Sequence, residues 1–330
     1  MQATKVLSWK SALMGLALLF LLAYPWLGAS SYLKHLFILF FIWSVVAANW
    51  NLLMGYAGIT SLGNIGFLAI GGYTSGILAK SFGLSPWVTI PIGGLAASLL
   101  VTLFLGLPAL RLSGIYIALL SLIFADSLPS LLTQTRGITG GAMGLHEIPG
   151  FLPGMEKVHA YYISLAFFLA IQYILYRTVR SSTGLAFVAL RDSEHLATTL
   201  GVNRFKERLK VFALSSFLTG VAGGVYVHSL GDISPTTLGI EPFLLGIAMM
   251  ELGGIGTFAG PILGSAVIVF GNEFLRLAGT LRLALLGALI CGIILFFPGG
   301  IMQLVERVEK WLRRRFNKLP PPSPGSRSHS

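Results

Sequence analysis

The sequence predicts an all-α polytopic membrane protein with about ten transmembrane helices in two inverted halves. Three observations predict this class. Apolar residues make up 55% of the 330 residues and charged residues only 11%, whereas soluble chains carry about 25% charge. The mean hydropathy of the chain is +0.80. Apolar runs near the ~20 residues that a spanning helix needs follow one another along most of the chain.

Ten apolar segments are candidate spans: 11–29, 33–54, 58–79, 87–110, 113–132, 159–176, 210–229, 241–253, 258–275 and 282–298. Two of them are irregular. Glycines interrupt the segment 58–79, and the segment 241–253 is too short to cross a membrane alone. Broken helices are tolerated at membrane depth only where their backbone is buried in protein or lines a wet cavity.

The two ends of the chain are expected to differ from this central region. The run 11–29 follows two lysines, as in a cleaved signal peptide, but its length favours an uncleaved span in a variable N-terminal region, 1–32. The central membrane region is expected to cover 33–303. The tail, 304–330, is basic and then rich in Pro and Ser, so we expect a partly disordered cytoplasmic segment.

The distribution of Lys and Arg predicts the orientation. With ten spans and the N-terminus inside, 17 of the 23 Lys and Arg residues lie on the cytoplasmic side. An odd number of spans loses this asymmetry. The positive-inside rule therefore predicts an N-in, C-in topology, in a cell (inner) membrane with its lipid.

Residues 177–210 form a charged island between apolar stretches. The island carries seven Lys or Arg residues against three acidic residues. Such a segment belongs on the cytoplasmic face and is long enough to fold into short helices against the membrane. It is a candidate docking surface for a soluble partner, although an ordinary amphipathic surface helix has the same composition.

Two short stretches of the chain match each other, residues 61–69 (SLGNIGFLA) and residues 251–259 (ELGGIGTFA). The first lies in the third predicted span and the second at the end of the eighth, an odd number of spans further on. The two units therefore run in opposite directions, as in transporters built from inverted repeats with broken helices. Chance, or simple packing through small residues, is the alternative explanation of the match. If the match is functional, the candidate translocation path includes Gly63, Asn64, Gly66, Glu251, Gly253, Gly254 and Gly256.

Asp126 lies in the middle of the predicted span 113–132. An ionisable side chain inside a membrane is costly, so it faces the interior of a bundle or a wet cavity. We therefore add Asp126 to the candidate path, with a structural hydrogen bond to a neighbouring helix as the alternative.

Several kinds of chemistry have no motif in this chain. It has no G-x-x-x-x-G-K-[ST] for ATP hydrolysis, no G-x-S-x-G for a serine hydrolase and no Cys/His cluster, and Cys291 is its one cysteine. We expect no catalytic residue, no metal and no cofactor in this chain. Its basic residues show no pattern typical of nucleic-acid binding. The histidines are scattered at loops and span ends, and their polar ring atoms are expected to be solvated at the membrane interface.

Several motifs occur together in a recognisable order. Residues 110–126, 138–145 and 252–264 are three of them. A further pattern covers the charged island and its flank, at Ala189, Arg191, Asp192, Glu194, Ala197, Gly201, Val202 and Asn203, followed by Gly231, Ile233, Ser234 and Pro235. Over residues 33–303 this combination resembles the LivM-type permease subunit of branched-chain amino acid ABC importers.

The resemblance implies a mechanism and a set of partners. The helix 191–203 is expected to dock on a cytoplasmic ATPase as the coupling helix, with two such ATP-binding subunits in the assembly. A second, LivH-like permease completes the pore, and a periplasmic or extracellular substrate-binding protein meets the loops 133–158 and 230–240. The expected coupling residues are Arg191, Asp192, Glu194, Ala197, Gly201 and Asn203, with Leu190, Leu196 and Leu200 entering the partner's groove.

The predicted function is that of a non-catalytic permease subunit for branched-chain or similar small amino acids. Importers of urea and short-chain amides use closely similar permeases, so the substrate stays open. A stand-alone secondary transporter needs an ion relay within one chain, for which only Asp126 and Glu251 are available. An intramembrane enzyme needs paired catalytic groups, and the sequence shows none.

Overall fold

The computed structural model describes residues 15–16, 18–26, 30–112, 114–152, 157–296, 299–303 and 307. The predicted tail 304–330, apart from Arg307, and much of the predicted first span 11–29 lie outside the described residues. Within the described part, regular structure is helical and includes no strand, apart from one isolated antiparallel bridge between Leu145 and Ile233.

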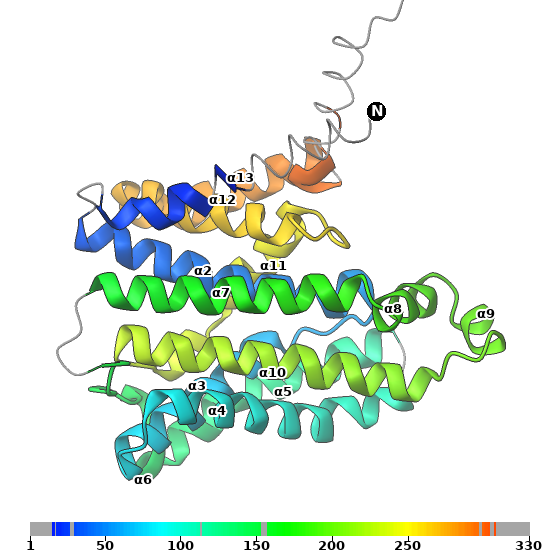
Figure 1. Cartoon of the computed structure of the whole chain (residues 1–330), viewed down its shortest axis with the longest axis horizontal. Helices are drawn as coiled ribbons and strands as arrows, with labels where there is room; N and C mark the ends of the chain where they lie inside the picture. Colours follow the sequence, from blue (N-terminus) through cyan, green and yellow to red (C-terminus); the bar gives the residue numbers. More distant parts are fainter. Residues whose placement is uncertain are drawn as a thin grey trace, which may run out of the picture.

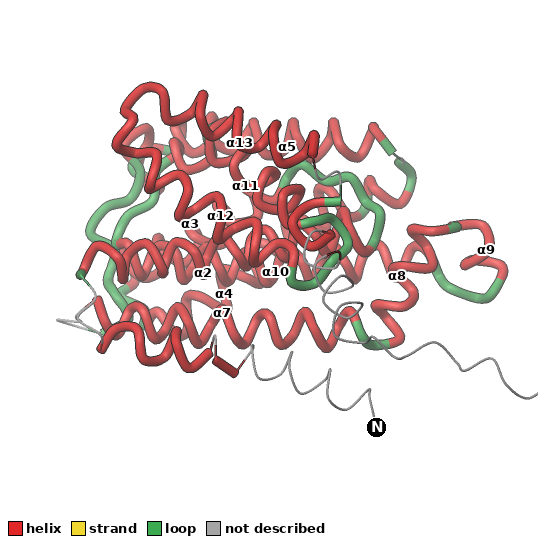
Figure 2. The backbone as a smooth tube through the Cα atoms, turned by 90° about the horizontal axis from the view of Figure 1, so that it is seen from above, coloured by secondary structure: helices red, strands yellow, loops and turns green. Residues whose placement is uncertain are grey.

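The long helices lie side by side along one direction and form a bundle (Figure 1, and from above in Figure 2). Their bounds are α2 Ser31–Asn51, α3 Asn64–Phe82, α4 Pro86–Val101, α5 Ile115–Gln134, α7 Lys157–Val179, α10 Arg204–Leu230, α11 Ile240–Gly253, α12 Gly260–Phe274 and α13 Arg282–Phe296. The short helices are α6 Arg136–Thr139, α8 Ser182–Asp192 and α9 Glu194–Thr199.

Shorter helical turns extend or connect these helices. Two helices are each extended by five residues of π-helix: α2 by η2, Leu52–Tyr56, and α4 by η3, Thr102–Gly106. The 3₁₀ turns are η1 Tyr24–Trp26, η4 Pro108–Leu110, η5 Gly141–Met143, η6 Pro235–Leu238 and η7 Leu275–Leu281.

Helices occur at each predicted span from 33–54 onward. Five of them are long and apolar enough to cross a membrane by length and composition: Ser31–Tyr56, Pro86–Gly106, Ile115–Gln134, Lys157–Val179 and Arg204–Leu230. The all-α polytopic class is therefore confirmed. The count of ten spans, the N-in, C-in orientation and the two inverted halves stay predictions.

The two irregular segments of the sequence are irregular in the structure. Residues 57–63 are non-helical, and α3 begins only at Asn64. The α11 helix has 14 residues, or roughly 21 Å of rise, which is less than the ~30 Å of a bilayer core. The two matching stretches differ in their placement, because 61–69 leads into α3 whereas 251–259 ends α11 and forms the loop to α12.

Helix α10 lies at the centre of the bundle and packs closely on α3 and α4. Small residues make this approach possible. A Cβ on Gly71 would collide with the backbone of Gly220, and a Cβ on Gly223 would collide with the carbonyl oxygen of Leu68 and lie 2.8 Å from the backbone nitrogen of Gly72. The backbones of α3 and α10 are therefore in direct contact.

Helix α2 packs on α7, α11 and α12, on another side of α10. Aromatic rings fill this interface. The rings of Phe41 and Tyr161 have centroids 5.4 Å apart, and those of Phe40 and Phe270 are 5.7 Å apart. Aromatic pairs at such distances stabilise packing beyond the burial of their area.

The two ends of the bundle differ in character (Figure 1). The helices α8 and α9 project from one end, which we call the island end. At the other end, which we call the loop end, the predicted outer loops meet: Leu145 and Ile233 form the bridge, and Ile148 N–H donates to the Gly231 carbonyl at 2.9 Å.

His228 at the loop end is buried, which makes the expectation of a solvated tip wrong for this residue. Its side chain lies 2.9 Å from the Ser75 hydroxyl and 3.1 Å from the Thr89 hydroxyl, and its other ring nitrogen lies 2.7 Å from the Pro149 carbonyl. Hydrogen bonds satisfy both ring nitrogens, so the imidazole joins α3, α4 and α10 to the outer loop.

The contact between α3 and α10 predicts the effect of a single added side chain. We expect Gly223→Val to lower the stability of the protein in detergent by about 1–3 kcal/mol, because overpacking forces the two backbones apart. Gly271→Val is the matched control, since a Cβ on Gly271, inside α12, meets nothing within 4 Å. Thermal unfolding of the two variants tests this. Equal midpoints would show that the glycine contact is dispensable.

Candidate functional site

The charged island folds as two short helices rather than as one helix over 191–203. Helix α8 ends at Asp192, and Ser193 adopts an extended conformation with φ −157°. The Ser193 hydroxyl then caps α9 by accepting from the Leu196 N–H. A serine that bonds the free N–H groups of the next helix is a common way to start a helix, and here it turns the chain between the two segments.

The projecting turn ends at Gly201. Its φ is +90°, in the left-handed region that glycine tolerates without strain. The Val202 N–H donates back to the Ala197 carbonyl at 3.0 Å and closes the end of α9. Asn203 then caps α10, because its side-chain oxygen accepts from the Lys206 N–H at 3.0 Å. The sequence expectation of a helix stop at Gly201 is confirmed.

Exposed leucines mark the outer side of α9. Leu196 is 63% exposed and Leu200 is 85% exposed. Ala197, between them, is buried against the bundle. Leu190, which was expected at the docking surface, instead lines a pocket beneath the projection. Of the three leucines expected at the docking surface, two are therefore exposed, on α9 and at its end, and Leu185 of α8 is exposed as well.

Arg191 makes contacts within the chain, while its side chain stays 36% exposed. Its guanidinium donates to the Gly55 carbonyl at 2.6 Å and forms an ion pair with Asp192 at 2.8 Å. A Cβ on Gly58 would lie 2.6 Å from the Arg191 side chain, and a Cβ on Gly256 would lie 3.4 Å from its guanidinium. The glycines therefore make room for the arginine.

Arg191 meets two irregular segments at once. We call residues 57–63 the first glycine loop and residues 254–259 the second glycine loop. The side chain of Asn51, at the end of α2, ties the second loop to the same place: its amide donates to the Thr257 carbonyl at 2.8 Å, and its oxygen accepts from the Gly256 N–H at 2.7 Å. The sequence reasoning missed Asn51, although an asparagine at the end of an apolar span is a usable signal.

Glu194 also makes its contacts within the chain. Its carboxylate forms ion pairs with Arg204 and, at 2.9 Å, with Arg208. Arg208 in turn donates to the carbonyl of Ala109 at 2.9 Å and to that of Leu112 at 3.4 Å. This charge-assisted chain links α9, through α10, to the turn that leads into α5.

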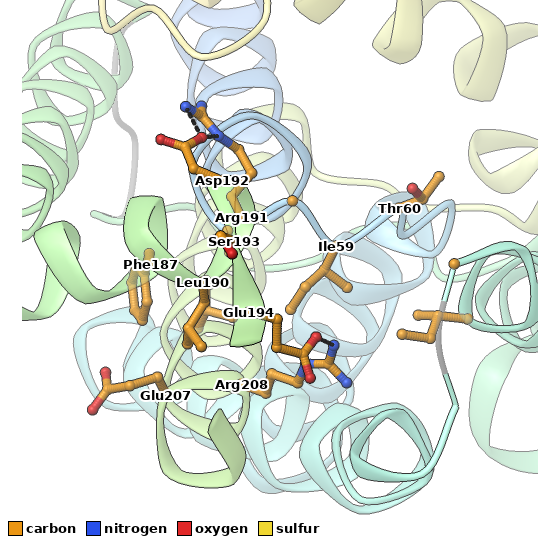
Figure 3. A pocket seen from close by; sticks show the side chains of 15 residues that line it. Ile59, Thr60, Phe187, Leu190, Arg191, Asp192, Ser193, Glu194, Glu207 and Arg208 are labelled. Carbon is orange, nitrogen blue, oxygen red and sulfur yellow. Dashed lines mark hydrogen bonds and ion pairs between the residues drawn. The ribbon is translucent and has the colours of Figure 1, made fainter. Parts of the chain in front are cut away.

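A pocket of about 260 Å³ lies between the projection and the bundle (Figure 3). Gly58, Arg191, Glu194 and Arg208 are among its lining residues, and the dashed lines mark the pairs of Arg191 with Asp192 and of Glu194 with Arg208. The pocket walls are thus the same contacts that hold α8 and α9 on the bundle. It is a gap beneath the projection of α8 and α9.

The candidate path residues fall into separate places. Gly63, Asn64 and Gly66 are buried at the start of α3, and the two glycines face α5. Gly253, Gly254 and Gly256 belong to the end of α11 and the second glycine loop. Glu251 is half-buried on α11, and Asp126 is exposed on α5. The structure does not bring all eight residues into one site.

The contacts of Asn51 predict how firmly the second glycine loop is held. We expect Asn51→Ala to raise amide hydrogen exchange in residues 254–259 at least about tenfold, because two hydrogen bonds to the loop are lost. Exchange measured by mass spectrometry in detergent checks this. Asn49→Ala is the matched control, since the Asn49 amide bonds only to the Val45 carbonyl of its own helix. Unchanged exchange in both variants would contradict the proposed tie.

The sequence also matches the model of a known protein family. A family described as "Branched-chain amino acid transport system / permease component" matches residues 32–297. The high-affinity branched-chain amino acid transport system permease protein LivM of Escherichia coli K12 is 28% identical over 292 residues, which cover 80% of this chain and 68% of that protein.

Two further relatives match over shorter stretches. A probable branched-chain amino acid permease, LivM of Methanocaldococcus jannaschii, is 23% identical and is matched over 68% of this chain and 76% of its own length. The nucleoside ABC transporter permease protein NupC of Lactococcus lactis is 28% identical, over 58% of this chain and 66% of its own. No solved structure matches the chain.

Proposed function

Because the chain belongs to the family of permease components of branched-chain amino acid transport systems, we propose that it imports branched-chain or similar small amino acids under ATP power. It is a multi-pass protein of the cell membrane and a permease component of an ABC transporter. In this proposal the chain catalyses no reaction and holds no cofactor. Separate ATP-binding subunits hydrolyse the nucleotide.

The contact of Arg191 with both glycine loops carries this proposal. The same short segment presents exposed Leu196 and Leu200 outward. Its Arg191 lies against Gly58 of the first glycine loop and Gly256 of the second. A partner that moves the projection therefore moves side chains bonded to the places where the helices are interrupted. That arrangement suits a mechanical link from a soluble motor to a membrane path.

The two ends of the bundle suit different partners. At the island end, α9 offers its leucines to the groove of a cytoplasmic ATPase, and a helix with spaced apolar anchors fits such a groove. The proposed assembly has two ATPases. At the loop end, the joined loops around Leu145 and Ile233 offer a surface to a periplasmic or extracellular binding protein. A second, LivH-like permease and membrane lipid complete the assembly.

The substrate is proposed from the LivM relatives. The test is transport of radiolabelled leucine by the whole assembly in liposomes, with nucleoside and urea as competing probes. We expect leucine uptake that requires ATP, the ATPases and the binding protein. Uptake by this chain without ATPases would overturn the proposal, and uptake of urea or nucleoside alone would overturn the substrate.

The exposed end of α9 predicts a docking defect. We expect Leu200→Asp to lower the amount of ATPase that co-purifies with the permease at least about tenfold, because a charge replaces a buried anchor at the interface. Leu152→Asp is the matched control, since Leu152 is also an exposed leucine but lies at the loop end. Co-purification that is normal for Leu200→Asp would place docking elsewhere.

A further inference from the structure

Helix α5 has an exposed side that changes character along its length. Only 22% of the apolar part of this helix is buried, and its buried residues are Ile117, Ala118, Ser121 and Leu132. In the first half of the helix the exposed residues are apolar or aromatic: Ile115, Tyr116, Leu119, Leu122 and Ile123. In the second half, apart from Leu131, they are polar: Asp126, Ser127, Ser130, Thr133 and Gln134.

Asp126 lies where the two halves meet, in the middle of the span. It is eleven residues after Ile115 and eight before Gln134, or roughly 17 Å and 12 Å of helix rise from the two ends. Among the described residues, none forms an ion pair with Asp126. An exposed carboxylate at this depth is costly in lipid, so it needs water or a partner from another molecule.

The exposed sides of two other spans are different. Helix α4 exposes Leu95 and Leu99, and the middle of α7 exposes Ala170 and Ile174. These apolar surfaces suit contact with lipid tails. The exposed side of α5 is therefore unlike that of its neighbours, and its second half does not suit lipid.

The hydroxyl groups of α5 do not share the difficulty of Asp126. Ser127 donates to the Phe124 carbonyl at 2.9 Å, and Thr133 donates to the Pro129 carbonyl at 2.7 Å, both within the helix. An ionised carboxylate has no proton to donate in this way. Asp126 is thus the group that shows that the exposed side of α5 faces something other than lipid.

The polar half of α5 opens toward the loop end of the bundle. Helix α5 follows Leu112, whose carbonyl accepts from Arg208 at the island end, and it contacts η6 at the loop end. Water can therefore follow the polar residues from the loop end as far as Asp126. Beyond Asp126, the exposed Leu119 and Ile123 form an apolar stretch of the kind that closes a path by excluding water.

We propose that Asp126 determines specificity in transport, because its carboxylate binds the ammonium group of the amino acid in a wet channel between α5 and the second permease subunit. This inference rests on the proposed function. Opposite charges attract more strongly at this depth than in bulk water. The Ser130 hydroxyl, one turn nearer the loop end on the same face, is placed to donate to the substrate's carboxylate. Leu122 and Ile123 offer apolar surface to its side chain.

Thiol labelling of the complete transporter in liposomes tests whether this face is wet. In a Cys291→Ser background, we expect Asp126→Cys and Ser130→Cys to react with a charged, membrane-impermeant methanethiosulfonate, because the reaction needs a thiolate in water. Leu95→Cys is the matched control, since Leu95 is also exposed in this chain but lies on an apolar face. It is expected to stay unreactive. Asp126→Cys that is as unreactive as Leu95→Cys would overturn the wet channel.

Leucine uptake by the same assembly tests the charge. We expect Asp126→Asn to lower kcat/KM for leucine at least about tenfold, since a charge-assisted contact is lost. Asp126→Glu keeps the charge and is expected to retain more of the uptake. Glu273→Gln is the control, because it removes a carboxylate that is already paired with Arg276. Normal uptake by Asp126→Asn would overturn the role of Asp126.

Co-purification separates substrate binding from assembly. We expect the second permease to co-purify with Asp126→Asn as it does with the wild type, because Asp126 faces the channel and not the partner's side chains. Loss of the second permease from this variant would show that Asp126 holds the two subunits together, and would overturn the substrate role. A wild-type assembly without ATP-dependent leucine uptake would instead refute the proposed function itself.

An analogue tests the ammonium group directly. We expect leucine to slow the labelling of Ser130→Cys during ATP turnover at least about threefold, since the bound substrate covers this turn. In 2-hydroxy-4-methylpentanoate a hydroxyl replaces the ammonium group, so this compound is expected to protect less. The further change Asp126→Asn is expected to remove the difference between the two compounds. Equal protection by both compounds with Asp126 in place would overturn the binding of the ammonium group.

Discussion

The constraint on which this structure depends is the pairing of backbone polar groups where helices are interrupted. Inside a bilayer no water satisfies a free N–H or C=O, so each break needs a side chain to do so. Trp50 donates to the Ser61 carbonyl at 2.6 Å, and Ser121 accepts from Leu62. Asn51 donates to the Thr257 carbonyl of the second glycine loop, and Arg191 donates to the Gly55 carbonyl. These bonds hold the glycine loops and decide what can move.

Two of these side chains belong to segments that approach from outside the loops themselves. Arg191 comes from the projecting α8, and Ser121 comes from the thinly packed α5. The loops are therefore stabilised in part by side chains from elements that are distant in the sequence. This differs from the contact between α3 and α10, where glycine backbones touch and small movements are opposed by direct collision. The bundle thus combines a rigid centre with breaks held by removable contacts.

The charged island illustrates how the same residues serve two surfaces. The sequence suggests that Arg191 and Glu194 face a partner, because charged residues in a loop are usually solvated. In the structure both are paired within the chain, and the exposed apolar residues Leu196 and Leu200 form the outer surface instead. The leucines and the ion pairs of the island thus occupy different places, and hydrogen bonds and ion pairs join α8 and α9 to the rest of the chain.

The sequence by itself determined the class, the positions of the long helices, the charged island and the places where glycines break α3 and α11. These are local properties, because the length and apolarity of a run decide whether it can be a span, and glycine weakens a helix wherever it stands. Only the tertiary structure decided which polar groups meet. Arg191 bonds Gly55 across 136 residues, Asn51 bonds Thr257 across 206, and His228 is buried beside Ser75 rather than solvated. Such pairings depend on how helices far apart in the chain pack together, and no pattern within a single segment contains that information.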